Sequence, residues 1–481
     1  MVKISTMEAN RVLRWFTGWP DLVKFLGLIT VTLVVTYYAP VAIRFIWYII
    51  LLGSYFFSKN EALWLALFLC TADGFIGFFG LYVATIPLLP GLPAIELSQL
   101  YIIITVIKAA RKNVRPALFY NKYIQVLFIY VIFSIIWGQM MGLSGGLNVY
   151  FRVVKGIIPL LLFFSIPRLF TDQGMYERLF RIIFVVVILA FAAQLFALFT
   201  GMSPTEAAGI APDEEKDRDE FRVFYNASST LLGLFGALYI LNRKDHRPGN
   251  RLMPFAVIIS SLSMAFLSAT RGWIISFSLV VILSVILTNV VRSGRNIRIV
   301  LIAIPVIIWA LTVPAISRQI DYARERLETM EAISEGDLTA RGTLQRLDYR
   351  SQRALGGWME NPVFGWGLSD RGYEYLDDHV GNQSILALYG ISGFLLLNGF
   401  LVYFVYMILG LYFRFPARHP GKNVLIIFVI FLAGWFFIHS TSGQQFSFAG
   451  MPEKLIPQAL FFSFGALQYQ KNLISINGKK V

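Results

Sequence analysis

The chain has 481 residues, of which 57% are hydrophobic and 15% are charged, and its mean hydropathy is +0.64. Soluble globular chains carry about 25% charged residues, so this composition excludes an ordinary soluble fold and indicates a surface largely covered by lipid. The formal net charge of +14 lies mostly in short connections between apolar runs, so we predict no nucleic-acid partner. The single cysteine, Cys70, cannot form an internal disulfide. The first 21 residues lack an apolar core, so we expect no signal peptide.

In chain order, apolar runs of a length that can cross a bilayer recur along the whole sequence. They predict an all-α polytopic integral membrane protein with about fourteen transmembrane helices. The expected spans are residues 22–39, 41–57, 62–80, 94–108, 122–141, 153–168, 180–200, 223–242, 253–270, 272–291, 298–315, 383–411, 423–440 and 453–469. We therefore divide the chain into a membrane body (1–315), one large extracytoplasmic loop that contains short helices (316–382) and C-terminal transmembrane helices (383–481).

The distribution of basic residues predicts the orientation. Counting through the spans, the connections rich in lysine and arginine fall on the same side as both termini, and these are 108–122, 243–251, 292–298 and 414–422. The positive-inside rule makes that side cytoplasmic. The opposite connections include an acidic segment at 201–221 and a glycine-rich one at 142–151. The long loop at 316–382 falls outside.

The external loop contains eight arginines and no lysine. Arginine presents a planar fork that binds phosphate through two hydrogen bonds, whereas lysine is a strongly hydrated point charge. This composition favours a diphosphate site, for which Arg341 is one candidate. Twelve acidic residues share the loop, and we interpret Arg318, Arg324 and Arg326, which lie among them, as surface ion pairs.

Residues 343–360 have the pattern of a helix with two different faces. Arg346, Arg350 and Arg353 follow one another at spacings that place them on one face. Like charges at this spacing destabilise a helix by roughly 0.2–0.5 kcal/mol, so the stripe predicts contact with an anion, either a substrate diphosphate or phospholipid headgroups. The helix should end before Pro362, and residues 364–367 (FGWG) predict a tight turn.

His379 lies at the end of the loop, beside Asp377 and Asp378. An imidazole next to carboxylates is suited to accept a proton near neutral pH, so His379 is either a general base or a histidine hydrogen-bonded within the loop. His439 ends a predicted span on the outside and is a second candidate. The remaining histidines, at 246 and 419, lie in basic cytoplasmic connections, and we expect them to be inert.

Two further charges lie close to the membrane. Arg271 occupies a very short outer connection between two apolar spans, where a charge is a candidate for function or for contact with lipid headgroups. Asp73 lies inside the third predicted span, and we favour a structural role for it as the partner of a basic residue such as Arg152 or Lys155.

Four short stretches resemble, in order and spacing, motifs of the O-antigen ligase and O-antigen polymerase superfamily. Residues 222–226 (RVFYN) resemble its Arg-x-x-x-Asn segment, and residues 268–272 (SATRG) resemble its membrane-embedded Ser-x-Ser-Arg element. Residues 361–368 (NPVFGWGL) resemble its Asn-Pro-x-x-Gly-x-Gly element. His379, followed by 390–393 (GISG), resembles the family histidine and the start of the next span, although the family's usual asparagine after the histidine is Val380 here.

The resemblance implies a C-type glycosyltransferase fold in the bacterial cytoplasmic (inner) membrane, with both termini in the cytoplasm and the active site on the extracytoplasmic face. It implies transfer of a glycan from a polyprenyl-diphosphate-linked donor, and deprotonation of the acceptor by His379 would give inversion by direct displacement. No DxD-like pair stands out as a metal site, the nearest being Asp377 and Asp378, so we expect no metal and no other cofactor. The catalytic residues would be His379, Arg271 and Arg346. The substrate-binding residues would be Arg222, Arg341, Arg350, Arg353 and Asp378.

The acceptor defines the alternatives. A polymerase, which we favour, joins lipid-linked repeat units to one another, with membrane lipids and a protein that regulates chain length as further partners. A ligase would transfer the finished glycan to lipid A core or another acceptor, and the residues do not separate the two. A flippase or other transporter would need polar spans and usually an internal repeat, neither of which the sequence indicates. A membrane scaffold would not need the arginine stripe.

Overall fold

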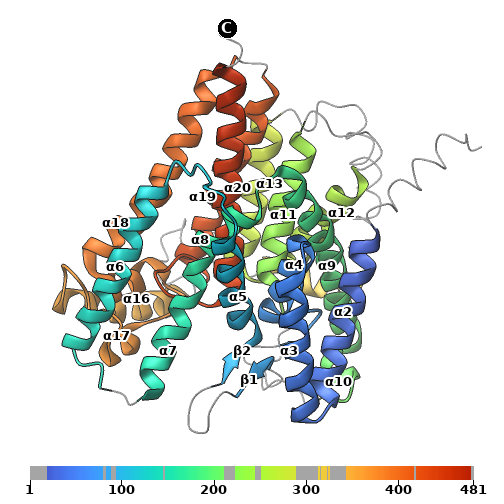
Figure 1. Cartoon of the computed structure of the whole chain (residues 1–481), viewed down its shortest axis with the longest axis horizontal. Coiled ribbons are helices and arrows are strands. Elements are labelled where there is room, and N and C mark those ends of the chain that lie inside the picture. Colours follow the sequence, from blue (N-terminus) through green and yellow to red (C-terminus); the bar gives the residue numbers. More distant parts are fainter. Residues whose placement is uncertain are drawn as a thin grey trace, which may run out of the picture.

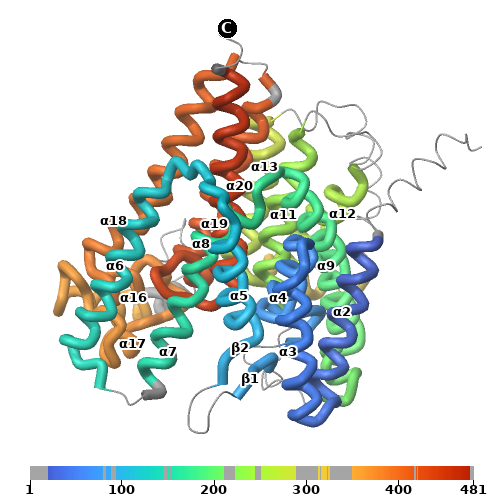
Figure 2. The backbone as a smooth tube through the Cα atoms, viewed as in Figure 1, coloured from blue at the N-terminus to red at the C-terminus, as the bar shows by residue number. Residues whose placement is uncertain are grey.

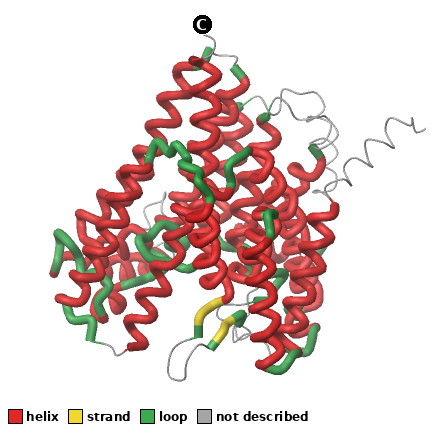
Figure 3. Tube along the Cα trace, viewed as in Figure 1, coloured by secondary structure: helices red, strands yellow, loops and turns green. Residues whose placement is uncertain are grey.

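In the computed structural model, helices account for most of the chain and run roughly side by side (Figure 1). The structure describes residues 19–79, 83–87, 94–144, 147–210, 223–243, 251–288, 313–314, 316–321, 323–324, 343–416 and 419–477. Within these residues, strands are confined to one short two-stranded hairpin (Figure 3). The predicted all-α class is therefore confirmed for the described part of the chain.

The first group of helices contains α2 (Trp19–Tyr38), α3 (Val41–Phe57) and α4 (Glu61–Asp73). The side chain of Asn60 accepts the backbone N–H of Leu63 and so caps the start of α4. Helix α4 ends earlier than the predicted span at 62–80, because the chain turns at Gly74 with a φ of 92°.

A hairpin follows, in which β1 (Thr85–Ile86) pairs antiparallel with β2 (Ile95–Glu96). It leads directly into α5 (Leu97–Arg111). Glu96 and Gln99 form a capping box, in which each side chain accepts a backbone N–H of the other residue. The hairpin is thereby fixed to the start of a helix and can support one wall of a site.

Lys108, inside α5, is buried against Glu61, with 2.9 Å between Nζ and Oε1. It also donates to the backbone carbonyls of Tyr55 at 3.0 Å and Ser58 at 2.9 Å. The sequence placed this lysine in the basic connection at 108–122, but the structure assigns it to a satisfied internal ion pair.

The middle of the chain contains α6 (Asn121–Met140), α7 (Leu147–Ile157), the 3-10 turn η1 (Ile158–Leu161), α8 (Leu162–Leu169), α9 (Gln173–Thr200) and α10 (Pro204–Ala207). Pro159 lies in η1, where the helix tightens between α7 and α8. Asp172 caps the start of α9, and Gly201 in the left-handed region ends it.

The second half contains α11 (Ala227–Asn242), α12 (Leu252–Leu267), α13 (Arg271–Leu287), α16 (Thr343–Glu360), α17 (Asp370–Tyr375), α18 (Gly381–Arg414), α19 (Pro420–Thr441) and α20 (Pro452–Asn477). Helix α16 ends at Glu360, so the predicted end before Pro362 is confirmed. Helix α20 packs against α4, α8, α11, α18 and α19, and Figure 2 shows it passing through the middle of the bundle.

Helices lie at every predicted span except 298–315, of which the structure describes only residues 313–314. Among the residues that the structure describes, six helical stretches are long and apolar enough to cross a membrane, and they are 20–38, 121–140, 149–169, 173–200, 381–414 and 421–441. Helices α3, α11, α12 and α13 are apolar but shorter. The protein is therefore membrane-embedded, while the number of fourteen crossings stays a prediction.

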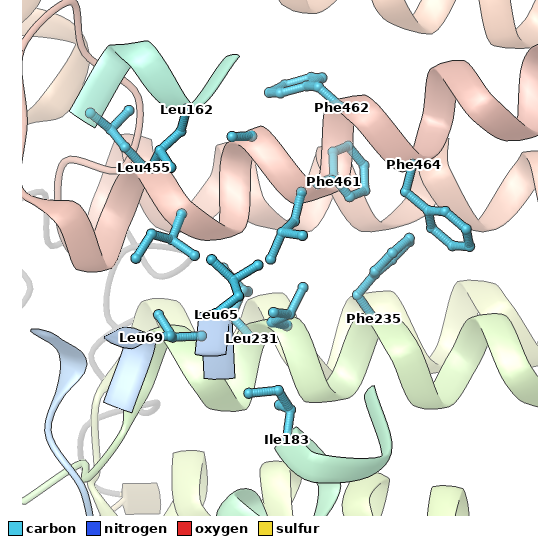
Figure 4. Packing of buried hydrophobic residues seen from close by; sticks show 14 of the residues in the cluster. Leu65, Leu69, Leu162, Ile183, Leu231, Phe235, Leu455, Phe461, Phe462 and Phe464 are labelled. Atoms are coloured by element: carbon cyan, nitrogen blue, oxygen red, sulfur yellow. The ribbon is translucent and has the colours of Figure 1, made fainter. Parts of the chain in front are cut away.

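Large aliphatic and aromatic side chains form the core between the helices. Figure 4 shows the meeting of α4, α9, α11 and α20, where the ring of Phe235 lies between Leu231 and Phe464. Phe235 is 1% exposed, and its ring centroid is 5.0 Å from that of Phe461. Such edge-to-face pairs add about 0.5–1.5 kcal/mol beyond the burial of apolar surface.

A second set of apolar side chains points outward. Several isoleucines on α3 and α6 are half to two-thirds exposed, among them Ile46 at 56%, Ile129 at 66% and Ile132 at 58%. Several large, exposed apolar side chains on one helix are unusual on soluble monomers and are typical of a surface that faces lipid. The outward faces therefore agree with the hydropathy of the sequence.

Two of the predicted basic connections, 108–122 and 414–422, lie at one end of the bundle in their described parts. The side chain of Gln470, near the end of α20, donates to the carbonyl of Ala117, and a Cβ on Gly421 would lie 2.5 Å from Oδ1 of Asn472. The connections before α6 and before α19 thus meet the last turns of α20. In Figure 1 the β-hairpin and α10 lie at the opposite end.

Candidate functional site

The turn at 361–367 is bonded to a break in α18. At Gly390 the chain leaves the helical region, with φ 62° and ψ −173°, which frees backbone groups on both sides of the break. The turn satisfies them through four hydrogen bonds: Trp366 N to Ala387 O (2.9 Å), Gly367 N to Leu388 O (2.7 Å), Ile391 N to Pro362 O (2.9 Å) and Ser392 N to Val363 O (3.2 Å). Broken helices inside membrane proteins require this kind of internal pairing.

The glycines of this turn are needed for close backbone contact. Gly365 and Gly367 have φ of 65° and 60°, in the left-handed region. A Cβ on Gly365 would lie 2.5 Å from the backbone nitrogen of Gly390, and one on Gly367 would lie 2.7 Å from that of Gly138 on α6. The predicted turn is confirmed, and it joins α6, α16 and α18.

The turn is followed by α17, whose first residue tethers a second loop. Ser144, just after α6, donates to the Asp370 carboxylate through its hydroxyl at 2.6 Å and through its backbone N–H at 3.0 Å. Both hydrogen bonds lower the pKa of Asp370, and the one from the hydroxyl has the larger effect. The loop after α6 and the start of α17 are thus held together.

The loop that carries His379 is fixed to α16 by Asp377. The Asp377 carboxylate, whose side chain is 9% exposed, lies 3.4 Å from Nη1 of Arg350 and 3.2 Å from Nη2 of Arg353. Its Oδ1 also accepts the backbone N–H of His379 at 2.9 Å. Two arginines of the predicted stripe therefore have an internal carboxylate as partner, and they hold the histidine loop in place.

The side chains of Asp378 and His379 are both exposed beyond this anchor. The carbonyl of Asp378 accepts the N–H of Gln444 at 2.5 Å, which connects the histidine loop to the loop between α19 and α20. We call the latter, residues 442–451, the wall loop. An exposed imidazole on a fixed loop can accept a proton from a bound hydroxyl group.

A cavity of about 840 Å³ lies between the histidine loop, the wall loop, the β-hairpin and the starts of α5 and α20. Its lining is rich in polar side chains and includes Gln99, Lys155, Tyr373, Asp378, Gln444, Gln445, Ser447 and Lys454. Lys155 donates to the carbonyl of Ala94 at 3.0 Å and lies 3.7 Å from Glu96 Oε1. Within the described chain, Lys454 has no carboxylate at ion-pair distance.

The last turn of α19 brings Arg271 to the same region as His379. Gly272, next to Arg271, packs so closely on α19 that a Cβ there would lie 1.7 Å from the hydroxyl oxygen of Ser442. Gly381, two residues after His379, packs on His439, one turn earlier in α19. Ala269, with a φ of 48°, is a strained non-glycine residue two positions before Arg271.

Of the predicted site residues, Arg350, Arg353, Asp378 and His379 thus gather around the histidine loop, and Arg271 lies at the same end of α19. Arg346 lies on α16, but its side chain falls outside the described residues. Arg222 and Arg341 lie entirely outside them. The absence of a metal stays a prediction.

The two lysines of the cavity lining are not among the site residues predicted from the sequence. Lys155 and Lys454 lie at ends of predicted spans on the external side, where the positive-inside rule makes lysine uncommon. That departure from the rule was the signal that could have identified them as candidates for anion binding.

The prediction that Lys155 is the partner of Asp73 is wrong, because Lys155 lies beside Glu96. The side chain of Arg152, the other predicted partner, falls outside the described residues. The Asp73 carboxylate instead accepts the backbone N–H groups of Ser228 at 3.0 Å and Ser229 at 2.7 Å, in the first turn of α11. A helix start carries free N–H groups and partial positive charge, so it stabilises a carboxylate without a basic side chain.

Neither protein-family models nor curated proteins match this chain. The resemblance to the O-antigen ligase and polymerase superfamily therefore rests on the short motifs at 222–226, 268–272, 361–368 and 379–393.

Proposed function

We propose that this protein is a membrane glycosyltransferase that polymerises polyprenyl-diphosphate-linked oligosaccharide repeat units on the outer face of the bacterial cytoplasmic membrane. The observation that carries the proposal is the large cavity beside the loop of the exposed His379, with Asp378, Lys155 and Lys454 in its lining. In the proposed orientation the basic connections at the C-terminal end of α20 face the cytoplasm, so the cavity lies toward the outer face.

The cavity has the charge that a diphosphate requires. Lys454 has no ion-pair partner within the described chain, and Lys155 has one carboxylate at 3.7 Å. The side chains of Gln99, Gln444 and Gln445 can donate hydrogen bonds to phosphate oxygens or to sugar hydroxyls. In a site shielded from bulk water, fixed cations stabilise developing diphosphate charge more strongly than they do in solution.

An apolar pocket adjoins the polar cavity, and Ser447 lines both. Its other lining residues are mostly aliphatic or aromatic, from α6, η1, α8, α18 and α20, and include Leu127, Val131, Phe163, Leu401 and Phe462. The pocket holds only about 40 Å³, against about 840 Å³ for the cavity, so it has room for at most a small part of a hydrocarbon chain next to the charged head. A polyprenyl diphosphate combines such a head with such a chain, and most of that chain would lie in the lipid.

The proposed reaction is a direct displacement at the anomeric carbon of the donor glycan. The hydroxyl oxygen of the acceptor forms a bond to that carbon, the bond from the carbon to the diphosphate oxygen breaks, and the anomeric configuration inverts. His379 takes the hydroxyl proton, and the diphosphate leaves with the bonding electron pair. Arg271, Arg346 and the cavity lysines stabilise the leaving group, with no metal required.

A binding experiment tests the cavity assignment. Undecaprenyl diphosphate should bind the purified protein at least about tenfold more tightly than undecaprenol, because only the former carries the charged head that the lysines recognise. Lys155→Gln and Lys454→Gln should each remove most of that difference. Lys471→Gln is the matched control, since Lys471 lies exposed at the other end of α20. Equal binding of the two lipids to the wild type would contradict the proposal.

A further inference from the structure

His439 lies in the last turn of α19 and is 1% exposed. Its ring lies between the rings of Phe436 and Phe446, at centroid distances of 5.7 and 5.4 Å. Gly381 packs on it from the start of α18, where a Cβ would lie 2.6 Å from Cε1 of the histidine. The reaction proposed above makes no use of this buried imidazole.

The hydrogen bonds of His439 define its protonation state. Its Nδ1 accepts the backbone N–H of Gln445 at 3.0 Å and that of Phe446 at 3.2 Å. A ring nitrogen that accepts two N–H groups carries no proton itself, so the proton of the neutral imidazole is on Nε2. His439 thus acts as a fixed acceptor for two consecutive amides of the wall loop.

The same part of the wall loop is bonded to the histidine loop. Gln445 is held further by Trp435 Nε1, which donates to its side-chain oxygen at 3.2 Å, and by Gln458 Nε2, which donates to its carbonyl at 2.8 Å. The neighbouring Gln444 N–H donates to the carbonyl of Asp378, next to His379. His439 is therefore connected to the histidine loop through two adjacent wall-loop residues, because Gln445 is bonded to His439 and Gln444 is bonded to Asp378.

We propose that His439 is a positioning residue, which fixes Gln444 and Gln445 in the cavity wall and, through Gln444, the loop that carries His379. The role in substrate binding rests on the proposed function, whereas the role in holding the wall loop does not. His439 acts through its Nδ1 as an acceptor, so a side chain that presents an acceptor at the same place can replace it.

Two substitutions separate the acceptor from the rest of the side chain. In His439→Asn, the amide oxygen lies close to the position of Nδ1 and can accept the same two N–H groups. In His439→Gln, the longer side chain places its amide nearer the position of Nε2. Both are neutral and polar, so a difference between them reports on the Nδ1 contact and not on charge or polarity.

The first readout is the accessibility of the wall loop. Ser447→Cys introduces a thiol of similar size into the cavity lining, and the native Cys70 is fully buried, so it gives little background. With a water-soluble maleimide, the introduced thiol should react about tenfold faster in the His439→Gln background than in the chain with native His439. The loss of one hydrogen bond changes the equilibrium for opening of the loop by roughly this factor. In the His439→Asn background the labelling rate should stay within about twofold. Equal rates in all three backgrounds would overturn the proposal.

A second readout needs no variant and so covers the case in which His439→Gln does not fold. In native hydrogen exchange, the amides of Gln445 and Phe446 should be protected, while unprotected exchange at both would overturn the role of Nδ1. With an active lipid-linked donor, His439→Gln should raise KM by about tenfold with a smaller change in kcat, and His439→Asn should restore it. Absence of transfer by the wild type would refute the proposed function, yet the labelling and exchange results would still decide whether His439 holds the wall loop.

Discussion

Gly390→Ala is the substitution that most directly tests how the turn at 361–367 supports the site. Gly390 breaks α18, and its φ of 62° with ψ of −173° belongs to a region that is essentially open only to glycine. A Cβ there would lie 2.3 Å from the carbonyl oxygen of Val363 and 2.5 Å from the nitrogen of Phe364. Both are backbone atoms, so no side-chain rotation can relieve the contact.

The expected loss of stability follows from two contributions. The backbone conformation costs an alanine about 1–3 kcal/mol. Moving the turn away from the new Cβ breaks some of the four hydrogen bonds that cross the helix break, and the loss of two of them costs about 1–3 kcal/mol. The sum is about 2–6 kcal/mol, which for a chain of 481 residues corresponds to a fall in the unfolding midpoint of roughly 2–6 °C.

The single cysteine offers a direct assay. Cys70 is fully buried, so a dye that becomes fluorescent on reaction with a thiol reports its exposure as the protein unfolds in detergent. Gly410→Ala is the matched control, because Gly410 lies on the same helix and a Cβ there meets no atom within 4 Å. We expect this control to unfold at or slightly above the wild-type midpoint. Equal midpoints for the two variants would refute the reasoning.

Asp73→Ala removes the acceptor for two amides at the start of α11, so the same dye assay should show a loss of about 1–2 kcal/mol, and a smaller loss for Asp73→Asn. The pKa of Asp370 is lowered, so its contact with Ser144 is complete above the ordinary aspartate range and is lost as the pH falls through the folded-state pKa. Proteolysis of the wild type between α6 and α7 should therefore accelerate as the pH falls through this pKa. The Ser144→Ala variant should already be cleaved quickly at neutral pH. His379→Ala and Arg271→Ala should each reduce transfer at least about 100-fold with unchanged unfolding midpoints, and wild-type rates would remove that residue from the site.

The sequence predicted the helices well, because apolar run length and capping residues act locally. The end of α16 before Pro362 and the turn at 364–367 followed from proline and glycine. The break in α18 could not be predicted in the same way, since 390–393 lies in an apolar run of helical length. Its cause is tertiary: the break is stable because the 361–367 turn satisfies the freed backbone groups.

The candidate site was predictable in part for a similar reason. His379 and the arginine stripe were visible as residue types and spacings, but the stripe's partner Asp377 was named only as a neighbour of the histidine. Its contacts with Arg350 and Arg353 depend on how the loop folds back over α16. The cavity lysines are almost 300 residues apart in sequence (155 and 454), so only the packing of distant helices brings them into one lining.

The most direct test of the central claim is transfer in vitro by the purified protein, with a polyprenyl-diphosphate-linked oligosaccharide as the sole substrate, a chelator present and the products sized on a gel. We predict a ladder of repeats for the wild type and none for His379→Ala. Transfer only after addition of lipid A core would identify a ligase instead of a polymerase. No transfer to either acceptor would contradict the account and favour a transporter.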